Sequence, residues 1–212
     1  MKSLLLLFLL PLSLAAAPLN QSETSALLEK IAAARAGRTV QAEFVEKKTL
    51  PLWKDPVIES GVIAFEPPDR FLRKTRNIML CDGKTLWMSY PEFQQVEKYP
   101  VSSHGPGQIF SALGQAMRFE HLEEIFRVSA SSLADGFRIE LTPKSVLLRR
   151  AIQTLTLELD SSLRLRSSTL TGRNGNIVET TYSNEKLLPP GTIDFTFTPP
   201  ASATVTAPLG ER

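Results

Sequence analysis

The chain contains very little cysteine and histidine, with one cysteine and two histidines in 212 residues. The single Cys81 excludes an internal disulfide and a metal site made of several thiolates; in its apolar stretch it is expected to be a small buried side chain. His104 and His121 are expected to be solvated, which leaves a Ser-His-Asp triad or a histidine metal site without its imidazole. Nucleophile-elbow, phosphate-loop and dinucleotide motifs are missing from the sequence too. The sequence therefore predicts a protein that is not an enzyme and uses no metal or cofactor.

An excess of charge of either sign is also lacking. The chain has 24 Lys and Arg against 22 Asp and Glu, a formal net charge of +2, which gives no electrostatic basis for binding nucleic acid. Its composition, with 42% hydrophobic and 22% charged residues, excludes a disordered chain, a collagen and a coiled coil. At about 100–200 residues per domain, the length fits one domain with a substantial core.

A long apolar run occurs only at the N-terminus. Lys2 is followed by Leu4–Leu14 and then by Ala15-Ala16-Ala17. A basic start, about 7–15 apolar residues and an Ala-x-Ala-like end are typical of a secretory signal peptide, and the run is shorter than the ~20 residues of a membrane span. We predict a signal peptide over residues 1–16 and one exported, soluble domain over 17–212, which is periplasmic if the host has two membranes. An uncut membrane anchor is the alternative.

The spacing of apolar residues then separates one helix from many strands. Asn20 and Glu23 form a capping-box pattern, and apolar residues at helical spacing follow as far as Gly37, which predicts a helix over Ser22–Ala36. From Thr39 onward the apolar period is two, as in strands with one buried face and one solvent face. This alternation is clearest in four sets: Val40, Ala42 and Phe44; Phe137, Ile139 and Leu141; Leu155, Leu157 and Leu159; and Ile193, Phe195 and Phe197.

Turn sequences separate about eleven expected strands. They are Pro67-Pro68-Asp69, Asp82-Gly83, Asp135-Gly136, Asp160-Ser161-Ser162, Asn174-Gly175-Asn176 and Pro189-Pro190-Gly191. Only around Gln108–Phe126 does helical spacing return. We therefore expect a barrel-like antiparallel sheet that carries the N-terminal helix and this insertion as a lid. A sheet of this size has room for a hydrophobic ligand cavity, although an ordinary filled core also fits the pattern.

Several short motifs resemble the periplasmic outer-membrane lipoprotein carrier (LolA) family. They are Ala42-Glu43-Phe44, the segment from Gly61 to Phe71 with its Pro-Pro-Asp-Arg-Phe centre, Asp82-Gly83-Lys84-Thr85-Leu86-Trp87, Gln95-Val96, Leu141-Thr142-Pro143-Lys144, and Phe195-Thr196-Phe197-Thr198-Pro199-Pro200 followed by Val205. Each motif is weak by itself. Their shared order and spacing behind a leader carry the resemblance, which covers essentially the whole mature chain.

The resemblance implies an unclosed antiparallel β-barrel of about eleven strands with a helical lid. It implies a monomeric carrier that takes acylated lipoproteins from an inner-membrane lipoprotein-releasing ABC transporter and passes them to an outer-membrane receptor lipoprotein. Each buried methylene contributes about 0.8 kcal/mol, so acyl chains need such shielding to cross the periplasm. The receptor shares the fold but has an N-terminal lipid-anchored cysteine. No cysteine follows the leader here, so the chain resembles the carrier.

Two sets of apolar residues are expected to form the binding site. Among them, Phe71 matches a family position implicated in handover from the exporter. The expected walls of the lipid-binding cavity are Phe44, Phe65, Phe71, Trp87, Phe137, Leu155, Leu157, Phe195 and Phe197. The expected lid residues are Leu27, Ile31, Ile109, Phe110 and Leu113.

The sequence departs from the family pattern at two positions. The family typically has an arginine before the turn proline, thought to hold the lid closed, whereas Pro67 occupies this place here. The family often has a tryptophan two residues after the position of Phe71, and here the residue is Arg73. Alternation puts Phe71 and Arg73 on one face. Arg73 is expected to act as a displaced latch or to contact a polar head group in the cavity, and the alternative is a side chain that reaches solvent from a strand end.

Two other functions remain open from the sequence. The departures at Pro67 and Arg73 favour a divergent paralogue that carries a non-protein lipid or glycolipid. A scaffolding protein with a filled core would bind neither hydrophobic dyes nor fatty acids.

Overall fold

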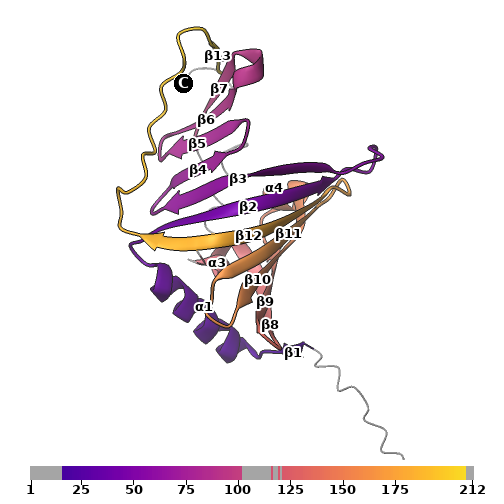
Figure 1. Cartoon of the computed structure of the whole chain (residues 1–212). Coiled ribbons are helices and arrows are strands. Elements are labelled where there is room, and N and C mark those ends of the chain that lie inside the picture. Colours follow the sequence, from indigo (N-terminus) through magenta and orange to yellow (C-terminus); the bar gives the residue numbers. More distant parts are fainter. Residues whose placement is uncertain (1–15, 102–115, 117–118, 120, 209–212) are drawn as a thin grey trace, which may run out of the picture.

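The computed structural model describes residues 16–101, 116, 119 and 121–208. Almost all of the predicted signal peptide and three predicted lid residues, Ile109, Phe110 and Leu113, lie outside this part of the chain. Within it, one sheet of thirteen strands accounts for most of the fold (Figure 1). The strands are β1 (Ala17–Pro18), β2 (Thr39–Thr49), β3 (Val57–Glu66), β4 (Arg70–Lys74), β5 (Ile78–Asp82), β6 (Thr85–Tyr90), β7 (Gln95–Pro100), β8 (Phe126–Leu133), β9 (Gly136–Pro143), β10 (Ile152–Asp160), β11 (Leu165–Gly172), β12 (Ile177–Leu188) and β13 (Thr204–Thr206).

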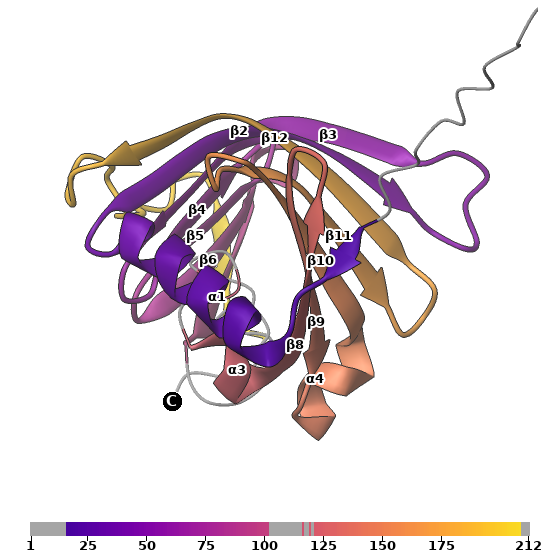
Figure 2. The ribbon, with the colours of Figure 1, turned by 90° about the horizontal axis from the view of Figure 1, so that it is seen from below.

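The sheet is curved but does not close. Its strand order is β1-β8-β9-β10-β11-β12-β2-β3-β4-β5-β6-β7-β13, and only the β7–β13 pairing is parallel. Seen from below, the strands form an arch with an open side (Figure 2). The edge strands β1 and β13 have two and three residues, and the other strands match the predicted count of about eleven. The predicted fold class, an unclosed and mainly antiparallel sheet, is confirmed.

The strands end at the expected turns, and the β5–β6 turn shows why. At the β5–β6 turn, Oδ1 of Asp82 accepts hydrogen bonds from the N–H groups of Lys84 and Thr85, while Gly83 adopts a φ of 95°. A left-handed φ of this kind favours glycine because it has no Cβ. The Asp-Gly pair therefore reverses the chain after a strand of only five residues.

Helix α1 (Gln21–Arg35) confirms the predicted N-terminal helix. The side chain of Asn20 accepts from the N–H of Glu23, and the carboxylate of Glu23 accepts from the N–H of Asn20, so the predicted capping box is formed. Shorter helices are η1 (Pro91–Phe93), α3 (Leu122–Ile125) and α4 (Val146–Ala151). Phe126, which the spacing assigns to a helix, is instead the first residue of β8 and is completely buried. Tertiary packing outweighs local spacing there.

Helix α1 covers the concave side of the sheet over β8–β11 and reaches β12 at its C-terminal end. It runs across the open side of the arch (Figure 2). Leu27, Leu28 and Ile31 of α1 enter one buried cluster with side chains from β8 to β11. The strand members of that cluster are Phe126, Ala130, Ile139, Leu141, Leu155, Leu157, Leu159 and Leu165. No residue of β2–β7 belongs to this cluster. The concave face of those strands is therefore not part of the core beneath α1.

A buried ion pair fastens the C-terminal end of α1 to the sheet. Nη2 of Arg35 lies 3.0 Å from Oε1 of Glu185, and the side chains are 4% and 7% exposed. Arg35 also donates to the carbonyl of Leu163, and its guanidinium lies over the ring of Phe119. Glu185 faces inward because β12 has a bulge between Ser183 and Lys186, and a bulge re-aims the side chains beside it.

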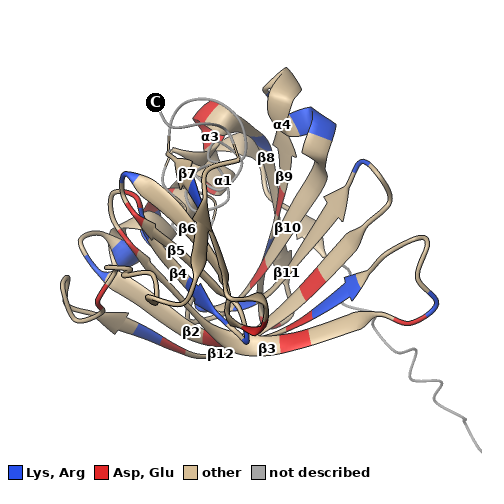
Figure 3. Cartoon of the chain, turned by 90° about the horizontal axis from the view of Figure 1, so that it is seen from above, with Lys and Arg blue, Asp and Glu red and all other residues tan. Residues whose placement is uncertain are grey.

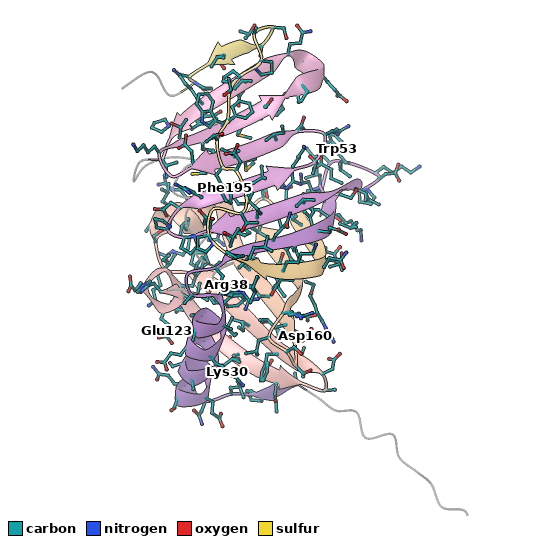
Figure 4. All side chains as sticks on the ribbon, turned by 60° about the vertical axis from the view of Figure 1, so that its left-hand side comes forward. Lys30, Arg38, Trp53, Glu123, Asp160 and Phe195 are labelled. Carbon is teal, nitrogen blue, oxygen red and sulfur yellow. The ribbon has the colours of Figure 1, made fainter. Side chains whose placement is uncertain are left out.

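The C-terminal segment covers the outer face of the other half. The strand predicted around Phe195 and Phe197 is wrong, because residues 193–200 form no strand. Figure 4 labels Phe195 on this segment where it passes the strands. The segment starts at Gly191, whose N–H donates to the buried carboxylate of Glu66, and the ring of Phe197 lies 5.5 Å from that of Trp87. Alternating apolar residues thus pack across strands here rather than pairing with them.

The Arg35–Glu185 pair generates a stability prediction. We expect Glu185→Gln to lower the free energy of unfolding by about 3–5 kcal/mol, because it leaves the buried guanidinium without its counter-charge. Urea denaturation of the purified protein measures this change. The control is Glu179→Gln on the same strand, since Glu179 and its partner Lys47 are each 51% exposed and such pairs contribute less than about 1 kcal/mol. Equal losses in the two variants would contradict the assigned role of Arg35.

Candidate functional site

A cavity of about 300 Å³ lies on the concave side of the sheet, beyond the part covered by α1. Strand register explains its lining, because residues paired across neighbouring strands face the same side. Ile63 pairs with Arg73, which pairs with Met79, and Leu155 pairs with Leu170. The lining residues are Glu46, Lys48, Ile63, Phe65, Phe71, Arg73, Met79, Leu155, Ser168, Leu170, Val178, Thr180 and Tyr182.

The inner part of the cavity is apolar and aromatic. The rings of Phe65 and Phe71 lie 4.9 Å apart in a tilted arrangement. A smaller recess next to the cavity shares Ile63, Phe65 and Tyr182 with it and extends to Glu185, the partner of Arg35 on α1. The apolar surface therefore continues from the cavity toward the fastened end of the helix.

Four charged side chains form an ionic cluster in the cavity wall: Glu46, Lys48, Glu59 and Arg73. Nη2 of Arg73 donates to Glu46 at 2.8 Å and to Glu59 at 3.2 Å. Nζ of Lys48 lies 3.1 Å from Glu46 and 3.0 Å from Glu59. Figure 3 shows acidic and basic segments along β2 and β3 at the base of the arch. Each carboxylate is thus held between an ammonium and a guanidinium group.

Burial and hydrogen bonding have opposite effects on the pKa of Glu59. Burial alone raises the pKa of its carboxyl, but the hydrogen bonds from Lys48 and Arg73 and the positive charges of these two groups together hold the pKa below the ordinary value of 4.5. The phenol of Tyr182 responds mainly to burial, which raises its pKa, and its oxygen lies 3.0 Å from Oγ of Ser168. The cavity therefore presents ionised groups on β2–β4 and neutral hydroxyls on β11 and β12.

The glycine at position 61 permits the tight curvature near this cluster. A Cβ placed on Gly61 would lie 2.0 Å from the carbonyl oxygen of Lys74, so the end of β4 comes onto the backbone of β3. Gly61 pairs with Phe44 on the inner face. The guanidinium of Arg73 covers the Phe44 ring at 4.9 Å from its centre, a geometry favourable for a cation over an aromatic face.

The predicted wall residues occupy three different places. Phe65, Phe71 and Leu155 line the cavity, and Phe44 lies beneath Arg73 on the same face. Leu157 is in the core beneath α1, and Phe137 packs against that core. Their apolar faces are already covered by the helix.

The other three predicted wall residues require a correction. Trp87 pairs with Leu80, which pairs with Leu72. Leu72 is the neighbour of Phe71, so this row faces away from the cavity. Phe195 is buried and Phe197 contacts Trp87. Trp87 and Phe197 therefore meet on the outer face, which the C-terminal segment covers, and Phe195 is buried on that segment.

The predicted lid residues Leu27 and Ile31 are buried in the core beneath α1. Arg73, expected as a latch or a head-group contact, lines the cavity together with Phe71. Its carboxylate partners Glu46 and Glu59 are on β2 and β3, not on a helix. Arg73 thus contributes to the wall of the cavity.

Sequence reasoning missed Glu46, Lys48 and Glu59. The signal was present, since Glu46 and Lys48 continue the alternation of Val40, Ala42 and Phe44 on the inward side of β2. Alternation alone does not identify such residues as part of a site, because ionised groups are rarely buried without partners and the partners here lie on neighbouring strands.

Neither His121 nor Cys81, the other described residues considered for chemistry, is among the residues that line the cavity. His121 precedes α3, is 73% exposed and contacts Glu124, whereas His104 lies outside the described residues. Cys81 is buried as expected, and burial raises the pKa of its thiol. Within the described ranges, no group of three or more His, Cys, Asp and Glu side chains is arranged to hold a metal ion. In the same part of the chain, no helix has the length and apolar character needed to cross a membrane.

Comparison with known proteins identifies a family. The family model described as outer membrane lipoprotein carrier protein LolA matches residues 35–198. A search of curated proteins gives no match. An uncharacterized conserved protein from Thermus thermophilus is 11% identical with a TM-score of 0.52, over 86% of this chain and 98% of that one. A LolA superfamily protein from Nitrosomonas europaea is 14% identical with a TM-score of 0.45, over 82% and 97%. The Thermus structure shows a shared fold.

The ionic cluster predicts a pH dependence of stability. The pKa of Glu59 is lower in the folded protein than its ordinary value of 4.5. Its contribution is therefore present above about pH 4.5 and is lost as the pH falls through the lowered folded pKa. We expect Glu59→Gln to reduce the loss of unfolding free energy on acidification from about pH 5 to 3, measured by urea denaturation. Glu179→Gln, an exposed carboxylate outside the cavity, is the control; the same reduction in both variants would refute this assignment.

Proposed function

The chain belongs to the LolA family of outer membrane lipoprotein carrier proteins, and from this premise we propose that it is a periplasmic carrier of acyl-chain cargo. The family is one of non-catalytic carriers. In the proposed cycle the chain receives acylated lipoproteins from an inner-membrane ABC transporter, shields their acyl chains, and delivers them to a receptor lipoprotein at the outer membrane.

The observation that carries the proposal is the apolar cavity on the concave side of an unclosed sheet. Phe65, Phe71 and Leu155, three of the residues proposed as its walls, line this cavity. Each methylene removed from water contributes about 0.8 kcal/mol, so an acyl chain of ordinary length gains enough from such a surface to remain bound in water. No residue of α1 is among those that line the cavity, so, as far as the described residues go, cargo can reach the cavity without unpacking the core beneath the helix.

A second cargo class is favoured by one feature of the cavity. Arg73 and its carboxylate partners are in the wall that a purely apolar cargo would contact. A non-protein lipid or glycolipid with a polar head offers partners for such groups, whereas an acyl chain alone offers none. The two candidates share the mechanism, which is reversible burial of acyl chains, and differ in what the chains are attached to.

Native mass spectrometry of the protein purified from its own periplasm tests both candidates. A bound acylated protein supports lipoprotein transport, and a bound lipid or glycolipid supports the second cargo class. A protein that is empty, and that also fails to bind bis-ANS or a fatty acid, would contradict any carrier function and favour a scaffold.

Filling the cavity tests whether it is the binding site. Ile63→Trp places a larger side chain in the cavity, and we expect it to weaken binding of a fluorescent fatty acid by about tenfold or more, ~1.4 kcal/mol. Ile58→Trp on the same strand is the matched control, because Ile58 is 67% exposed and pairs with Lys47 on the outer face. Fluorescence titration measures both affinities. Unchanged affinity in Ile63→Trp, with the fold retained by circular dichroism, would place the binding site elsewhere.

A further inference from the structure

The ionic cluster lies on the side of the cavity formed by β2–β4, whereas the lining residues on β10–β12 include no charged side chain. Along the inward positions of β2, the exposed fraction of the side chain rises from 3% at Phe44 to 13% at Glu46 and 34% at Lys48. The β2 wall of the cavity therefore becomes both more polar and more accessible in the direction of the β2–β3 hairpin. Across the cavity floor the same row remains apolar, because Lys48 pairs with Val178, which pairs with Leu170, which pairs with Leu155.

Four ionised groups in the wall of an apolar cavity carry a desolvation cost that apolar side chains at these positions would avoid. Replacement of buried ion pairs by apolar side chains of similar size is often neutral or stabilising. A wall that contacted only acyl chains would work better with such side chains, as Leu155 and Leu170 do on the facing strands. The cluster thus points to a ligand with a polar part.

Arg73 in the ionic cluster has N–H donors left for the polar part of such a ligand. A guanidinium group has five N–H donors. In Arg73, Nη2 donates both of the hydrogen bonds to the carboxylates. With respect to the described residues, this leaves Nη1 and Nε of a cavity-lining side chain as donors for a ligand. On the facing wall, the hydroxyl groups of Ser168, Thr180 and Tyr182 supply neutral hydrogen-bonding partners.

The charges around the cluster favour an anion. Lys48 and Arg73 balance Glu46 and Glu59, and Arg76 approaches Glu59 at 3.7 Å, which gives three positive charges against two negative ones. Arginine and lysine are the side chains that bind phosphate oxygens, arginine through its planar fork and lysine as a point charge. A phosphate-bearing head group satisfies both the excess charge and the remaining donors.

We propose that the ionic cluster is a head-group subsite, which binds the phosphate of an acylated amphiphile while its acyl chain lies against Phe65, Phe71 and Leu155. This inference rests on the proposed carrier function and specifies its cargo as a phosphate-bearing lipid. Arg73 is the central donor, Lys48 holds the entrance, and the two carboxylates keep both cations in place when the cavity is empty.

Two probes with the same acyl chain separate the head group from the chain. They are 1-tetradecanoylglycerol 3-phosphate and 1-tetradecanoylglycerol, titrated below their aggregation concentrations by isothermal titration calorimetry. We expect the wild-type protein to bind the phosphate form at least about tenfold more tightly. In Lys48→Met this preference should fall to about the value of one, with the affinity for the neutral probe retained.

The matched control is Lys47→Met, which changes the adjacent residue on the outer face of β2 and should keep the full preference. Arg73→Met leaves two carboxylates without their guanidinium partner, and we expect it to destabilise the fold for that reason alone. The double variant Arg73→Met with Glu46→Gln removes one charge of each sign, so it retains the charge balance and should also lose the preference.

The outcomes distinguish this inference from the proposed function. If wild type binds both probes equally, or if Lys48→Met and Lys47→Met keep the same preference, the head-group subsite is refuted and the carrier function stands. If wild type binds neither probe nor a fatty acid, the carrier function fails and the subsite fails with it. A preference for phosphate that disappears only in the cavity-facing variants supports the proposal.

Discussion

The structure depends on one constraint, which is that a large sheet with an apolar concave face has to be covered where it does not close on itself. A closed barrel covers its interior by geometry alone. Here the edges β1 and β13 do not pair with each other, so the cover has to come from other segments. Over β8–β11 it is helix α1, whose leucines and isoleucine complete a core. Beyond that limit lies the cavity, in the region that the described helices do not fill.

The two covering segments are fastened by buried carboxylates. Glu185, turned inward by the bulge in β12, holds Arg35 at the end of α1. Glu66 faces the outer side of β3, where it accepts from Thr39 and from the N–H of Gly191 at the start of the C-terminal segment. Buried ionised groups of this kind are tolerated only with good partners. They determine where each segment docks, whereas the apolar contacts around them supply most of the favourable free energy.

The polarity of the cavity is distributed in a way that suits an amphiphile. On the wall formed by β2–β4, Phe65 and Phe71 occupy the end away from the β2–β3 hairpin, and the ionic cluster occupies the part toward it. Register alone produces this gradient, because the inward positions of β2 change from alanine and phenylalanine to glutamate and lysine along one strand. A sheet that carries both classes of residue on one face can orient a ligand without a specific pocket for each of its atoms.

The sequence by itself determined the fold class, helix α1 with its capping box, the turns and the family, because each of these depends on local spacing, turn chemistry or ordered motifs. Alternation also assigned Phe71 and Arg73 to one side of the sheet. It did not decide which side each row faces relative to the cavity, and so Trp87, Phe195 and Phe197 were placed with the wrong face. Only the tertiary structure decided that, because the outer face is apolar too and its cover is a C-terminal segment that crosses the strands without pairing. Likewise, Glu185 acquires its role from a bulge in β12 and from Arg35 on α1. The charged inward positions of β2 acquire theirs from partners on β3 and β4, which the spacing within one strand does not encode.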